Sequence, residues 1–560
     1  MNYFHVNMNK IKYINIIRKK QQKAREKAPI WPLSIPTIGL YLSASSQKGE
    51  IIMNASIYIL ISIIVYLLGM LAIGAFYSKR NNSSADFYLG GRKLGPVVVA
   101  LSTEASDMSS WLLMGVPGLA YFCGLADAAW TVIGLAVGTY LNWLIVAKRL
   151  RRYSVKVDAI TIPDFFAHRF RDKSGLIEGI AALIIIVFFV PYTASGFAAC
   201  GKLFTNLFDV DYMAAMLISA AVIVGYCAMG GFMAASVTSL IQSIVMTVAL
   251  VVILLFGINA AGGWAAVMEN ARSIPGYLSM TASTSISSAV PGKYGFLSIV
   301  STLAWGLGYF GMPHILNHFM AIKDEEKLKI SRRVGETWVV ISMTVAIIVG
   351  IVGFAMSRVG AITTFENASA AEAVIVHIAS LLGQNGVLAA LLAGLVLAGI
   401  LASTMSTADA QLLAAASAIS HNLLQGVFHL KLSNKQEMFI ARVTVLAVAV
   451  LGVLFARDPG SSVFGIVSFA WAGFGAAFGP VMLFALFWKR CNRYGALAGL
   501  VTGGAVVFIW KYLVRPLGGA WNIYELLPAF IAACIAIVAV SLLTPAPEKA
   551  IVEEFESIGK

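Results

Sequence analysis

An apolar segment that is long enough to cross a bilayer carries the stretch Ser102-Thr103-Glu104-Ala105-Ser106-Asp107-Met108-Ser109-Ser110-Trp111. This stretch holds two carboxylates and five hydroxyl side chains. A carboxylate in the middle of a membrane costs about 2.5–3.5 kcal/mol even on the mild insertion scale, so it is kept where it faces a cavity, an ion or a partner. The stretch therefore predicts a spanning helix that is locally opened to bind something.

The composition is that of a protein embedded in a membrane. Of 560 residues, 59% are hydrophobic and 12% are charged, whereas soluble domains carry about 25% charged residues. The net charge of +14 does not indicate a nucleic-acid partner. Beyond the N-terminal segment the basic residues lie mostly in short loops between spans, where the positive-inside rule predicts them. The five cysteines are scattered and show no metal-binding spacing.

Hydropathy predicts about thirteen transmembrane helices in a single membrane domain. They are expected near residues 55–77, 96–122, 127–148, 176–204, 211–229, 233–261, 294–321, 333–357, 383–421, 437–456, 462–488, 494–514 and 525–543. Lys and Arg are concentrated in every second loop, beginning with the loop after the first span. This asymmetry predicts that the C-terminus is cytoplasmic.

The segment before Met53 differs from the rest of the chain. Residues 1–52 carry nine basic and two acidic side chains, which is half of the net charge. The codons for Lys48-Gly49-Glu50 can contain a purine-rich ribosome-binding site at a suitable distance from Met53. Two interpretations stay open: translation starts at Met53, or residues 1–52 are a disordered basic extension. Residues 53–545 are expected to form the transmembrane domain, and residues 546–560 a short cytoplasmic tail.

Helix breakers cluster in three of the predicted spans. They are Gly115, Pro117 and Gly118 in the second span, Gly306, Gly308, Gly311 and Pro313 in the seventh, and Gly473, Gly475, Gly479 and Pro480 in the eleventh. Non-helical backbone at membrane depth persists only where it is buried in protein or lines a cavity. Interrupted segments at corresponding positions of two halves indicate inverted repeats around a site at the midplane. The second and seventh spans would each open a repeat of five helices.

The chain from Met53 to about Pro545 resembles the sodium/solute symporters, most closely the bacterial sodium/proline symporters. The matching motifs are Ala105-Ser106-Asp107-Met108-Ser109 with Trp111-Leu112-Leu113-Met114-Gly115, Phe188 to Gly196 with Tyr192, Trp305 to Gly311 with Pro313-His314, Met405-Ser406-Thr407, and Trp471 to Pro480. The resemblance implies an all-α polytopic protein of the bacterial cell membrane. It also implies a LeuT-type core of inverted repeats (5+5), with one extra helix before it and two after. The implied activity is Na⁺-coupled uptake of L-proline by alternating access.

The resemblance also implies a sodium site. Its ligands would be the carbonyls of Ala105, Met108 and Ser403 and the hydroxyls of Ser406 and Thr407. Oxygen ligands suit a hard cation such as Na⁺, and opened backbone supplies several of them. From the sequence alone another interpretation is equally good, in which the two hydroxyls only bond back to carbonyls four residues earlier.

Substrate binding is expected at the same break. Free N–H groups and the positive end of a helix suit a carboxylate, and Ser109 can add a hydroxyl. Aromatic side chains would wall a slot for a small ring, with Pro313 shaping the seventh span; they are Trp111, Tyr192, Trp305 and Tyr309. The alternative for any single aromatic residue is packing or an interfacial position.

Three carboxylates are candidates for support of ion coupling: Glu104, Asp107 and Asp409. Asp107 either stabilises Na⁺ or caps the second half of the broken helix. Many relatives carry an aspartate just after the position of Thr238, where this chain has none. Asp409 is therefore interpreted as a relocated carboxylate, which leaves a second cation or a proton open. Glu104 also departs from the family, and it either takes part in coupling with Asp107 or opens to water.

Two further departures, Ser110 for Gly and Met312 for Gln, leave the substrate open. The alternative is a Na⁺-coupled symporter that transports another small amino acid or an organic acid. A transporter-like sensor is disfavoured by the short C-terminal tail. An enzyme is disfavoured because His314, His318 and His377 make no convincing metal site and no Ser-His-Asp pattern is present. The sequence gives no sign of an obligate protein partner.

Overall fold

The computed structural model describes residues 36–78, 84–287 and 290–558. The chain comprises two units, Met1–Asn54 and Ala55–Lys560. Of the first unit, the structure describes only the start of helix α2 (Pro36–Ser78). Residues 1–35, for which the sequence left two interpretations open, lie outside the described residues. Translation from Met53 stays a prediction.

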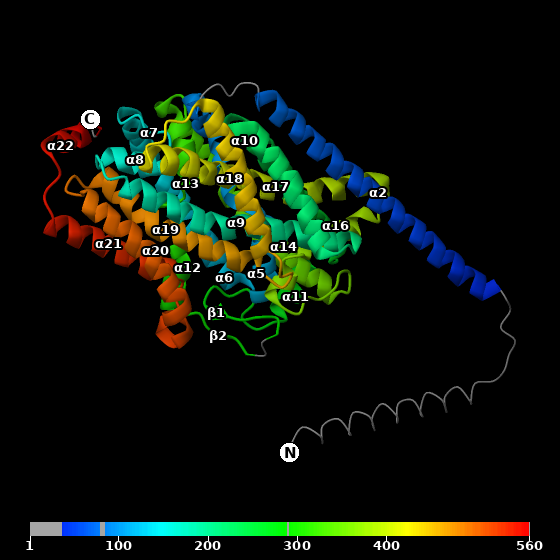
Figure 1. The fold of residues 1–560 in the computed structure, drawn as a ribbon. Helices are drawn as coiled ribbons and strands as arrows, with labels where there is room; N and C mark the ends of the chain where they lie inside the picture. Colours follow the sequence, from blue (N-terminus) through cyan, green and yellow to red (C-terminus); the bar gives the residue numbers. More distant parts are fainter. Residues whose placement is uncertain (1–35, 79–83, 288–289, 559–560) are drawn as a thin grey trace, which may run out of the picture. The chain divides into compact units, whose positions relative to one another are not determined.

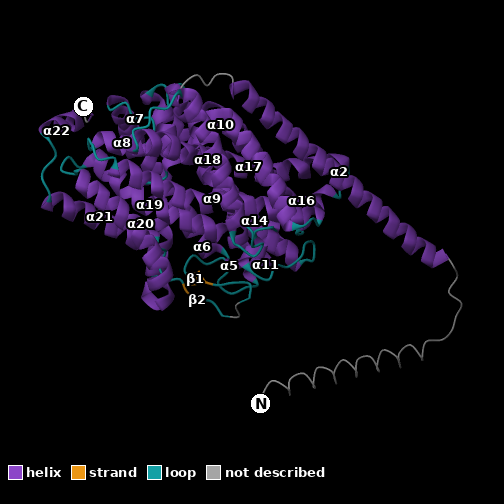
Figure 2. Ribbon diagram, in the orientation of Figure 1, coloured by secondary structure: helices purple, strands orange, loops and turns teal. Residues whose placement is uncertain are grey.

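Helices make up almost all of the described part of the second unit (Figure 2). In a bilayer every backbone polar group must be satisfied within the protein, which favours helices for such apolar runs. Polar residues mark where helices begin. The side chains of Thr161, Ser433 and Asn492 accept hydrogen bonds from the first-turn N–H groups of the helices that follow.

The first repeat begins with an interrupted span. After α3 (Ser84–Leu89) and η1 (Gly90–Arg92), it consists of α4 (Pro96–Ser110), η2 (Trp111–Gly115), α5 (Val116–Cys123), α6 (Leu125–Leu141), η3 (Asn142–Val146), α7 (Ala147–Lys156), α8 (Ile162–Arg169), α9 (Leu176–Phe208) and α10 (Tyr212–Ala260). The backbone of helix α10 breaks at Gly231, where φ is 64°, and the break separates a shorter apolar segment from the span Gly231–Ala260.

The second repeat follows α11 (Trp264–Arg272) and a two-stranded antiparallel sheet, β1 (Ala282–Ser283) and β2 (Gly292–Lys293). It consists of α12 (Phe296–Leu303), η4 (Ala304–Phe310), α13 (Pro313–Ala321), η5 (Glu325–Lys327), α14 (Leu328–Arg358), α15 (Ala368–Ala371), α16 (Val374–Gly383), α17 (Val387–Ser417), η6 (Ala418–Val427), α18 (Asn434–Phe455) and α19 (Val463–Phe487). Beyond it lie α20 (Arg493–Ile509), η7 (Trp510–Val514), η8 (Arg515–Leu517), η9 (Gly519–Trp521), α21 (Leu526–Leu543) and α22 (Lys549–Ile558) (Figure 1).

Within the described residues, ten helices are long and apolar enough to cross a membrane, or eleven if the bent pair Phe296–Phe310 and Pro313–Ala321 is one span. The predicted spans near 96–122 and 211–229 are not among them. The first is divided into α4, η2 and α5, and the second is represented by the shorter apolar helix Tyr212–Gly225. The predicted number of thirteen is therefore not confirmed.

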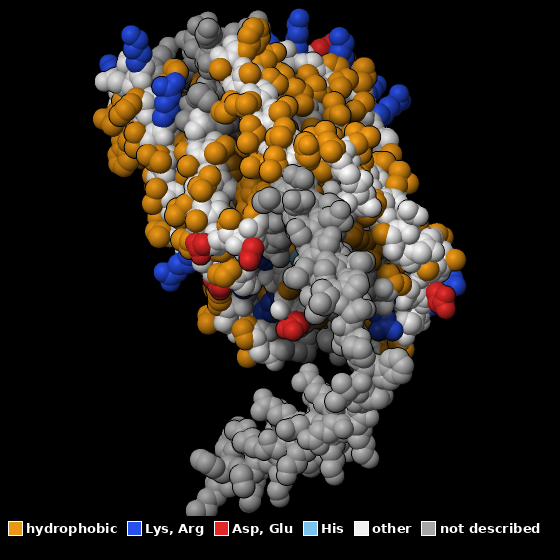
Figure 3. Space-filling view, turned by 90° about the vertical axis from the view of Figure 1, so that its right-hand side faces the viewer, with side chains coloured by type: hydrophobic (Ala, Val, Ile, Leu, Met, Phe, Trp, Pro, Cys, Tyr) orange, Lys and Arg blue, Asp and Glu red, His pale blue; other side chains and the backbone are white. Residues whose placement is uncertain are grey.

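The surface agrees with a membrane location. Figure 3 shows a face covered largely by hydrophobic side chains, with charged side chains mostly toward its edges. Large apolar side chains remain exposed on several spans, among them Val65, Ile218 and Ile535. Such a surface is compatible with lipid rather than with water.

Close helix contacts hold the second interrupted span in place. Gly138 of α6 faces Gly306 of η4, and a Cβ atom on either glycine would collide with the backbone of the facing segment. Small residues of this kind let membrane helices approach backbone to backbone. The segment η4 is thereby fixed against α6, beside the break that separates η4 from α13.

Candidate functional site

The helix α4 ends in the middle of the protein, where the sequence predicts a break. Ser109 adopts φ 48° and ψ −171°, a backbone region that costs a residue other than glycine about 1–3 kcal/mol. The side-chain oxygen of Ser109 accepts a hydrogen bond of 3.1 Å from the N–H of Trp111. All residues of the predicted stretch from 102 to 111 are buried. The break is therefore enclosed by protein, as non-helical backbone at membrane depth requires.

A second helix, α17, places its hydroxyl groups against this break. The hydroxyl of Ser406 donates hydrogen bonds to the carbonyl of Ala105, at 2.7 Å, and to that of Ser403, at 3.1 Å. The hydroxyl of Thr407 is buried and has no hydrogen-bond partner among the described residues. The structure thus brings together Ala105, Ser403 and Ser406 of the five residues predicted for the sodium site, and Thr407 follows Ser406 on α17. Met108 lies on α4 with Ala105, and its carbonyl accepts a hydrogen bond from the N–H of Trp111.

Asp107 connects the two interrupted spans. Its Oδ2 atom accepts a 2.5 Å hydrogen bond from the hydroxyl of Tyr309 on η4. Its backbone carbonyl accepts a 3.3 Å hydrogen bond from the hydroxyl of Tyr192 on α9. The first N–H of the segment that begins at Trp111 is bound by the side chain of Ser109. These contacts place Asp107 between the two interrupted spans, and its support of Na⁺ binding stays a prediction.

Aromatic side chains close a small cavity beside Asp107. The rings of Trp111 and Trp305 are 5.7 Å apart, and Phe464 of α19 lies 6.0 Å from the first and 5.3 Å from the second. The cavity has a volume of about 10 Å³, which is room for about one water molecule. A larger ligand therefore requires these rings to separate.

The lining of this cavity includes three predicted residues, Trp111, Tyr192 and Trp305. Asp107 and Met108, which the sequence analysis assigned to ion binding, also line the cavity. The remaining lining residues were not predicted as site residues from the sequence: Leu135, Met343, Val467 and Trp471. For Trp471 a signal was present, because it opens a motif rich in glycine. For the remaining three the sequence offers only apolar residues in apolar helices.

The other three predicted substrate residues, Ser109, Tyr309 and Pro313, do not line the aromatic cavity, although Tyr309 binds Asp107 of its lining. Ser109 lines a separate small cavity with Thr407 and Gln411, on the side of the break that faces α9. Pro313 is the first residue of α13 and is buried. Its ring fixes the backbone where the second interrupted span resumes its helical course. It acts on the shape of the span and does not line either cavity.

Glu104 and Asp409 extend in other directions from the site. Oε1 of Glu104 accepts a 2.7 Å hydrogen bond from the indole N–H of Trp143 and a 3.5 Å bond from Thr139, so this carboxylate lies against α6 and η3. Asp409 lies on α17, two residues beyond Thr407, and accepts a hydrogen bond from the thiol of Cys227 on α10. Cys227 precedes the break of α10 at Gly231, whereas relatives are expected to carry their aspartate after it, next to the position of Thr238. The relocation of a carboxylate to Asp409 therefore stays a prediction.

Glu372, which follows α15, binds the first turn of α19. Its carboxylate accepts hydrogen bonds from the hydroxyl of Ser462 at 2.8 Å and from the N–H groups of Val463 and Phe464 at 3.1 and 3.0 Å. Lys202 of α9 lies 2.7 Å from the same carboxylate, and both side chains are buried. Negative charge at the beginning of a helix is favourable. This arrangement fixes Phe464 over the aromatic cavity.

Arg92 closes the second unit at the end opposite to Glu372. Its guanidinium donates hydrogen bonds to the carbonyls of Met320 at 2.8 Å, Ala159 at 2.6 Å and Ser154 at 3.2 Å. Burial lowers the pKa of Arg92 to about 10, so the side chain stays charged at neutral pH. One residue thereby joins the end of α13 to the segment between α7 and α8.

The described part of the chain contains no group of three or more His, Cys, Asp or Glu side chains that could hold a metal ion. The site therefore offers mainly hydroxyl and carbonyl oxygens, with one carboxylate nearby. Such a donor set fits a monovalent hard cation next to unwound helix segments.

Comparison with known proteins concerns the chain as a whole. The model of the sodium:solute symporter family matches residues 87–503. The osmoregulated proline transporter OpuE of Bacillus subtilis is 40% identical over 497 residues, which is 88% of this chain and 96% of that protein. The sodium/proline symporter of Escherichia coli is 39% identical over 510 residues, which is 90% of this chain and 96% of that protein.

A solved structure shows the same fold at low sequence identity. It is a Na⁺-coupled sialic acid symporter in a substrate-bound, outward-open state, described as revealing a novel Na⁺ site. The TM-score is 0.71 at 16% identity, and the match covers 88% of this chain and 99% of that one. At this identity the likeness concerns the fold alone.

Proposed function

Because the chain belongs to the sodium:solute symporter family, we propose that it takes up L-proline together with Na⁺ by alternating access. The proposal draws the substrate from relatives named as proline transporters and sodium/proline symporters. It draws the mechanism from one observation above all. Two interrupted helices meet at the bond between Asp107 and Tyr309, and α17 presents hydroxyl groups to the same break.

The sodium ion is proposed to bind between α4 and α17. The carbonyls of Ala105, Met108 and Ser403 and the hydroxyls of Ser406 and Thr407 would supply its ligands. Support comes from the 2.7 Å hydrogen bond from the hydroxyl of Ser406 to the carbonyl of Ala105, by which the two helices are in direct contact. The Thr407 hydroxyl is buried without a hydrogen-bond partner in the part of the chain that the structure describes. Such an oxygen has a desolvation cost that an ion would offset.

Proline is proposed to bind on the other side of the break. The N–H groups freed at residues 109–110 suit its carboxylate. Its ring would occupy the space among Trp111, Tyr192 and Trp305, with Tyr309 holding Asp107 beside them. Ser109 and Pro313 would act through the shape of the breaks. Because the present cavity holds about one water molecule, binding would require Phe464 and Trp305 to move apart.

Alternating access would use the two closures in turn. Release of α19 from Glu372 would open the side of the protein that Phe464 covers. Release of Arg92 from the three carbonyls would open the other side. The basic loops and the tail at residues 546–560 are proposed to face the cytoplasm of a bacterial cell, according to the positive-inside rule. Cysteine labelling of the tail from either side of the membrane tests this orientation.

A second substrate class has its own observation. Ser110 and Met312 stand where the proline carriers are expected to have Gly and Gln, and both are buried near the breaks. A hydroxyl in place of a hydrogen changes the polar contacts that a pocket can offer. The alternative is therefore a Na⁺ symporter for another small amino acid or an organic acid.

One experiment separates these functions. Purified protein in proteoliposomes is given labelled proline with an inward Na⁺ gradient, with an equal K⁺ gradient, or with no gradient, and a panel of amino and organic acids competes. Accumulation above equilibrium only with Na⁺, blocked best by proline, supports the proposal. Stronger competition by another solute would assign the substrate to that solute. Equal uptake under all three conditions would contradict Na⁺ coupling.

A further inference from the structure

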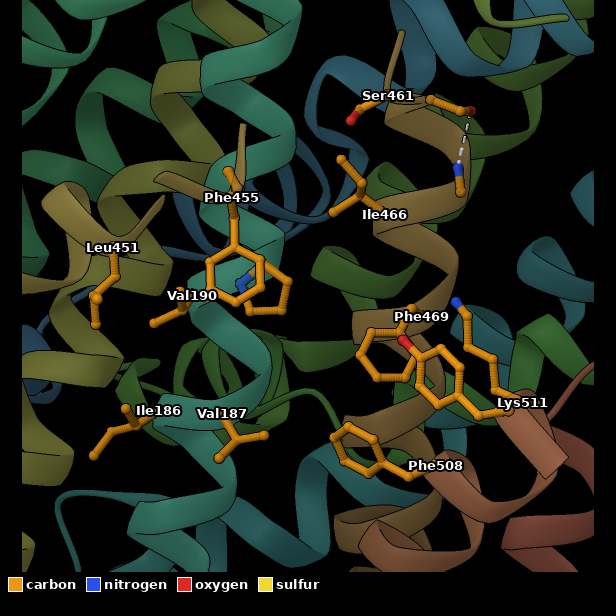
Figure 4. Close-up of a pocket in the computed structure, with 15 residues that line it drawn as sticks. Ile186, Val187, Val190, Leu451, Phe455, Ser461, Ile466, Phe469, Phe508 and Lys511 are labelled. Carbon is orange, nitrogen blue, oxygen red and sulfur yellow. Dashed lines mark hydrogen bonds between the residues drawn. The ribbon is translucent and has the colours of Figure 1, made fainter. Parts of the chain in front are cut away.

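A large apolar groove lies on the lipid-facing side of α9 and α19, two of the helices that contribute to the candidate site. Its volume is about 730 Å³, and its walls come from α9, α18, α19 and the junction of α20 with η7 (Figure 4). Val187, Leu451, Phe469 and Phe508 belong to this lining. Such a volume is within the range of pockets that hold drug-sized ligands, about 300–1,000 Å³. No residue of the groove lines the aromatic cavity near Asp107.

The groove is polar at the end where Lys511 and Tyr512 lie. Nζ of Lys511 is 4.3 Å from the centre of the Phe469 ring, on the groove wall. It is also 3.6 Å from Oε1 of Glu525, and Arg515 lies 2.9 Å from the other oxygen of the same carboxylate. Two cationic groups thus share one carboxylate, which leaves a net positive charge at this end of the groove.

The position in the bilayer selects the occupant. The helices around the groove are spanning segments, so the medium that meets the groove is hydrocarbon. Lys511 is near the end of the span Arg493–Leu517, where lysine and tyrosine side chains lie at the level of lipid headgroups. An occupant must therefore be apolar along most of its length and anionic at one end.

We propose that the groove binds one anionic phospholipid, with an acyl chain along α9 and α19 and its phosphate next to Lys511. The site adjoins the helix that covers the aromatic cavity. Ser462, Gly465 and Ile466 line the groove, whereas Phe464 of the same helical turn lies over Trp305. The bound lipid thereby stabilises the first turns of α19 in the position that closes the site.

Lipid retention tests the proposal without reference to transport. The full-length protein is reconstituted with phosphatidylglycerol and phosphatidylcholine, extracted, and examined by native mass spectrometry. Val187→Trp places a large side chain in the groove from an exposed position of α9. Leu183→Trp, one turn earlier on α9 and also exposed, is the matched control outside the groove lining. Lys511→Gln removes the positive charge that would bind the phosphate.

The parent protein and Leu183→Trp are expected to retain one phosphatidylglycerol, and Val187→Trp about tenfold less. Lys511→Gln is expected to lower retention about fivefold, since a lysine near the surface is worth about 1 kcal/mol toward an anionic lipid. Added phosphatidylglycerol should raise the melting temperature of the parent and not that of Val187→Trp, because a ligand of the folded state stabilises it.

Three results would overturn the proposal. One is equal retention by Val187→Trp and Leu183→Trp. Another is equal retention of phosphatidylcholine and phosphatidylglycerol by the parent protein. The third is the detection of a second polypeptide bound to the protein in place of the lipid. If Val187→Trp does not fold, Lys511→Gln decides the question by the same readouts, because it changes a partly exposed side chain.

Discussion

The hydroxyl of Tyr309 donates a 2.5 Å hydrogen bond to Oδ2 of Asp107, and this bond joins the two interrupted helices of the protein at their breaks. Both side chains are buried. A buried polar atom that loses its partner bears its full desolvation cost, about 1–3 kcal/mol. The bond therefore makes the geometry of each break dependent on the other.

Asp107→Asn is expected to abolish Na⁺-stimulated uptake of proline, because it removes the carboxylate that binds Tyr309 at the break. Tyr309→Phe keeps that carboxylate and should raise the Na⁺ concentration for half-maximal uptake about tenfold. Uptake as a function of Na⁺, in both single variants and the double variant, measures the coupling. The double variant should behave like Asp107→Asn, since groups in direct contact are not additive. Unchanged Na⁺ dependence in Asp107→Asn would restrict this residue to a structural role.

Ser406→Ala is expected to weaken Na⁺ binding at least about tenfold, because it removes a proposed ligand that lies 2.7 Å from the Ala105 carbonyl. Ser417→Ala is the matched control, since this serine is on the same helix and its hydroxyl donates a hydrogen bond to the carbonyl of Ala414, within its own helix. The measurement is Na⁺-dependent uptake at saturating proline. Equal effects of the two substitutions would indicate that Ser406 acts only in helix packing.

Asp409→Ser is expected to change the number of Na⁺ ions that accompany each proline, if the carboxylate has moved from α10 to α17. Adding Ser239→Asp should restore the original number, because it returns a carboxylate to the position that relatives use. Both residues are buried. Reversal potentials of proline flux in proteoliposomes give the stoichiometry. Failure of the second substitution to restore it counts against the relocation.

Glu372→Gln is expected to destabilise the closed position of α19. It breaks a buried ion pair with Lys202, and loss of one partner of such a pair costs about 3–5 kcal/mol. Thermal unfolding should shift to a lower temperature, and a thiol reagent should reach a cysteine placed at Phe464 more quickly. Glu366→Gln, at an exposed position of the same loop, is the control. Equal reactivity in the two variants would mean that Glu372 does not hold the helix.

The interrupted spans could be predicted from the sequence because their signals are local. The polar stretch from Ser102 to Trp111 cannot stay buried in a regular apolar helix at low cost, and the break occurs at Ser109. The contact of Ser406 with Ala105 was accessible only through family resemblance, since it joins residues about 300 positions apart. Nothing local distinguishes Leu135 or Met343 from other apolar residues. Their places in the cavity depend on how whole helices pack.

The direction of the Glu104 side chain shows the same limit. Spacing along α4 placed it next to Asp107, but it lies against Trp143 and close to Gly335. On a helix, residues three apart share a face only approximately. A neighbouring helix that offers an indole N–H decides which way such a side chain turns.

The glycine contact between α6 and η4 restricts how this protein can move. Because Gly138 and Gly306 leave no space for a side chain between the two backbones, these segments cannot slide past each other without first separating. They must travel as one rigid body through the cycle. A pair of spin labels placed on α6 and η4 would accordingly report one constant distance, whereas a pair on η4 and α9 would report two different distances during the cycle.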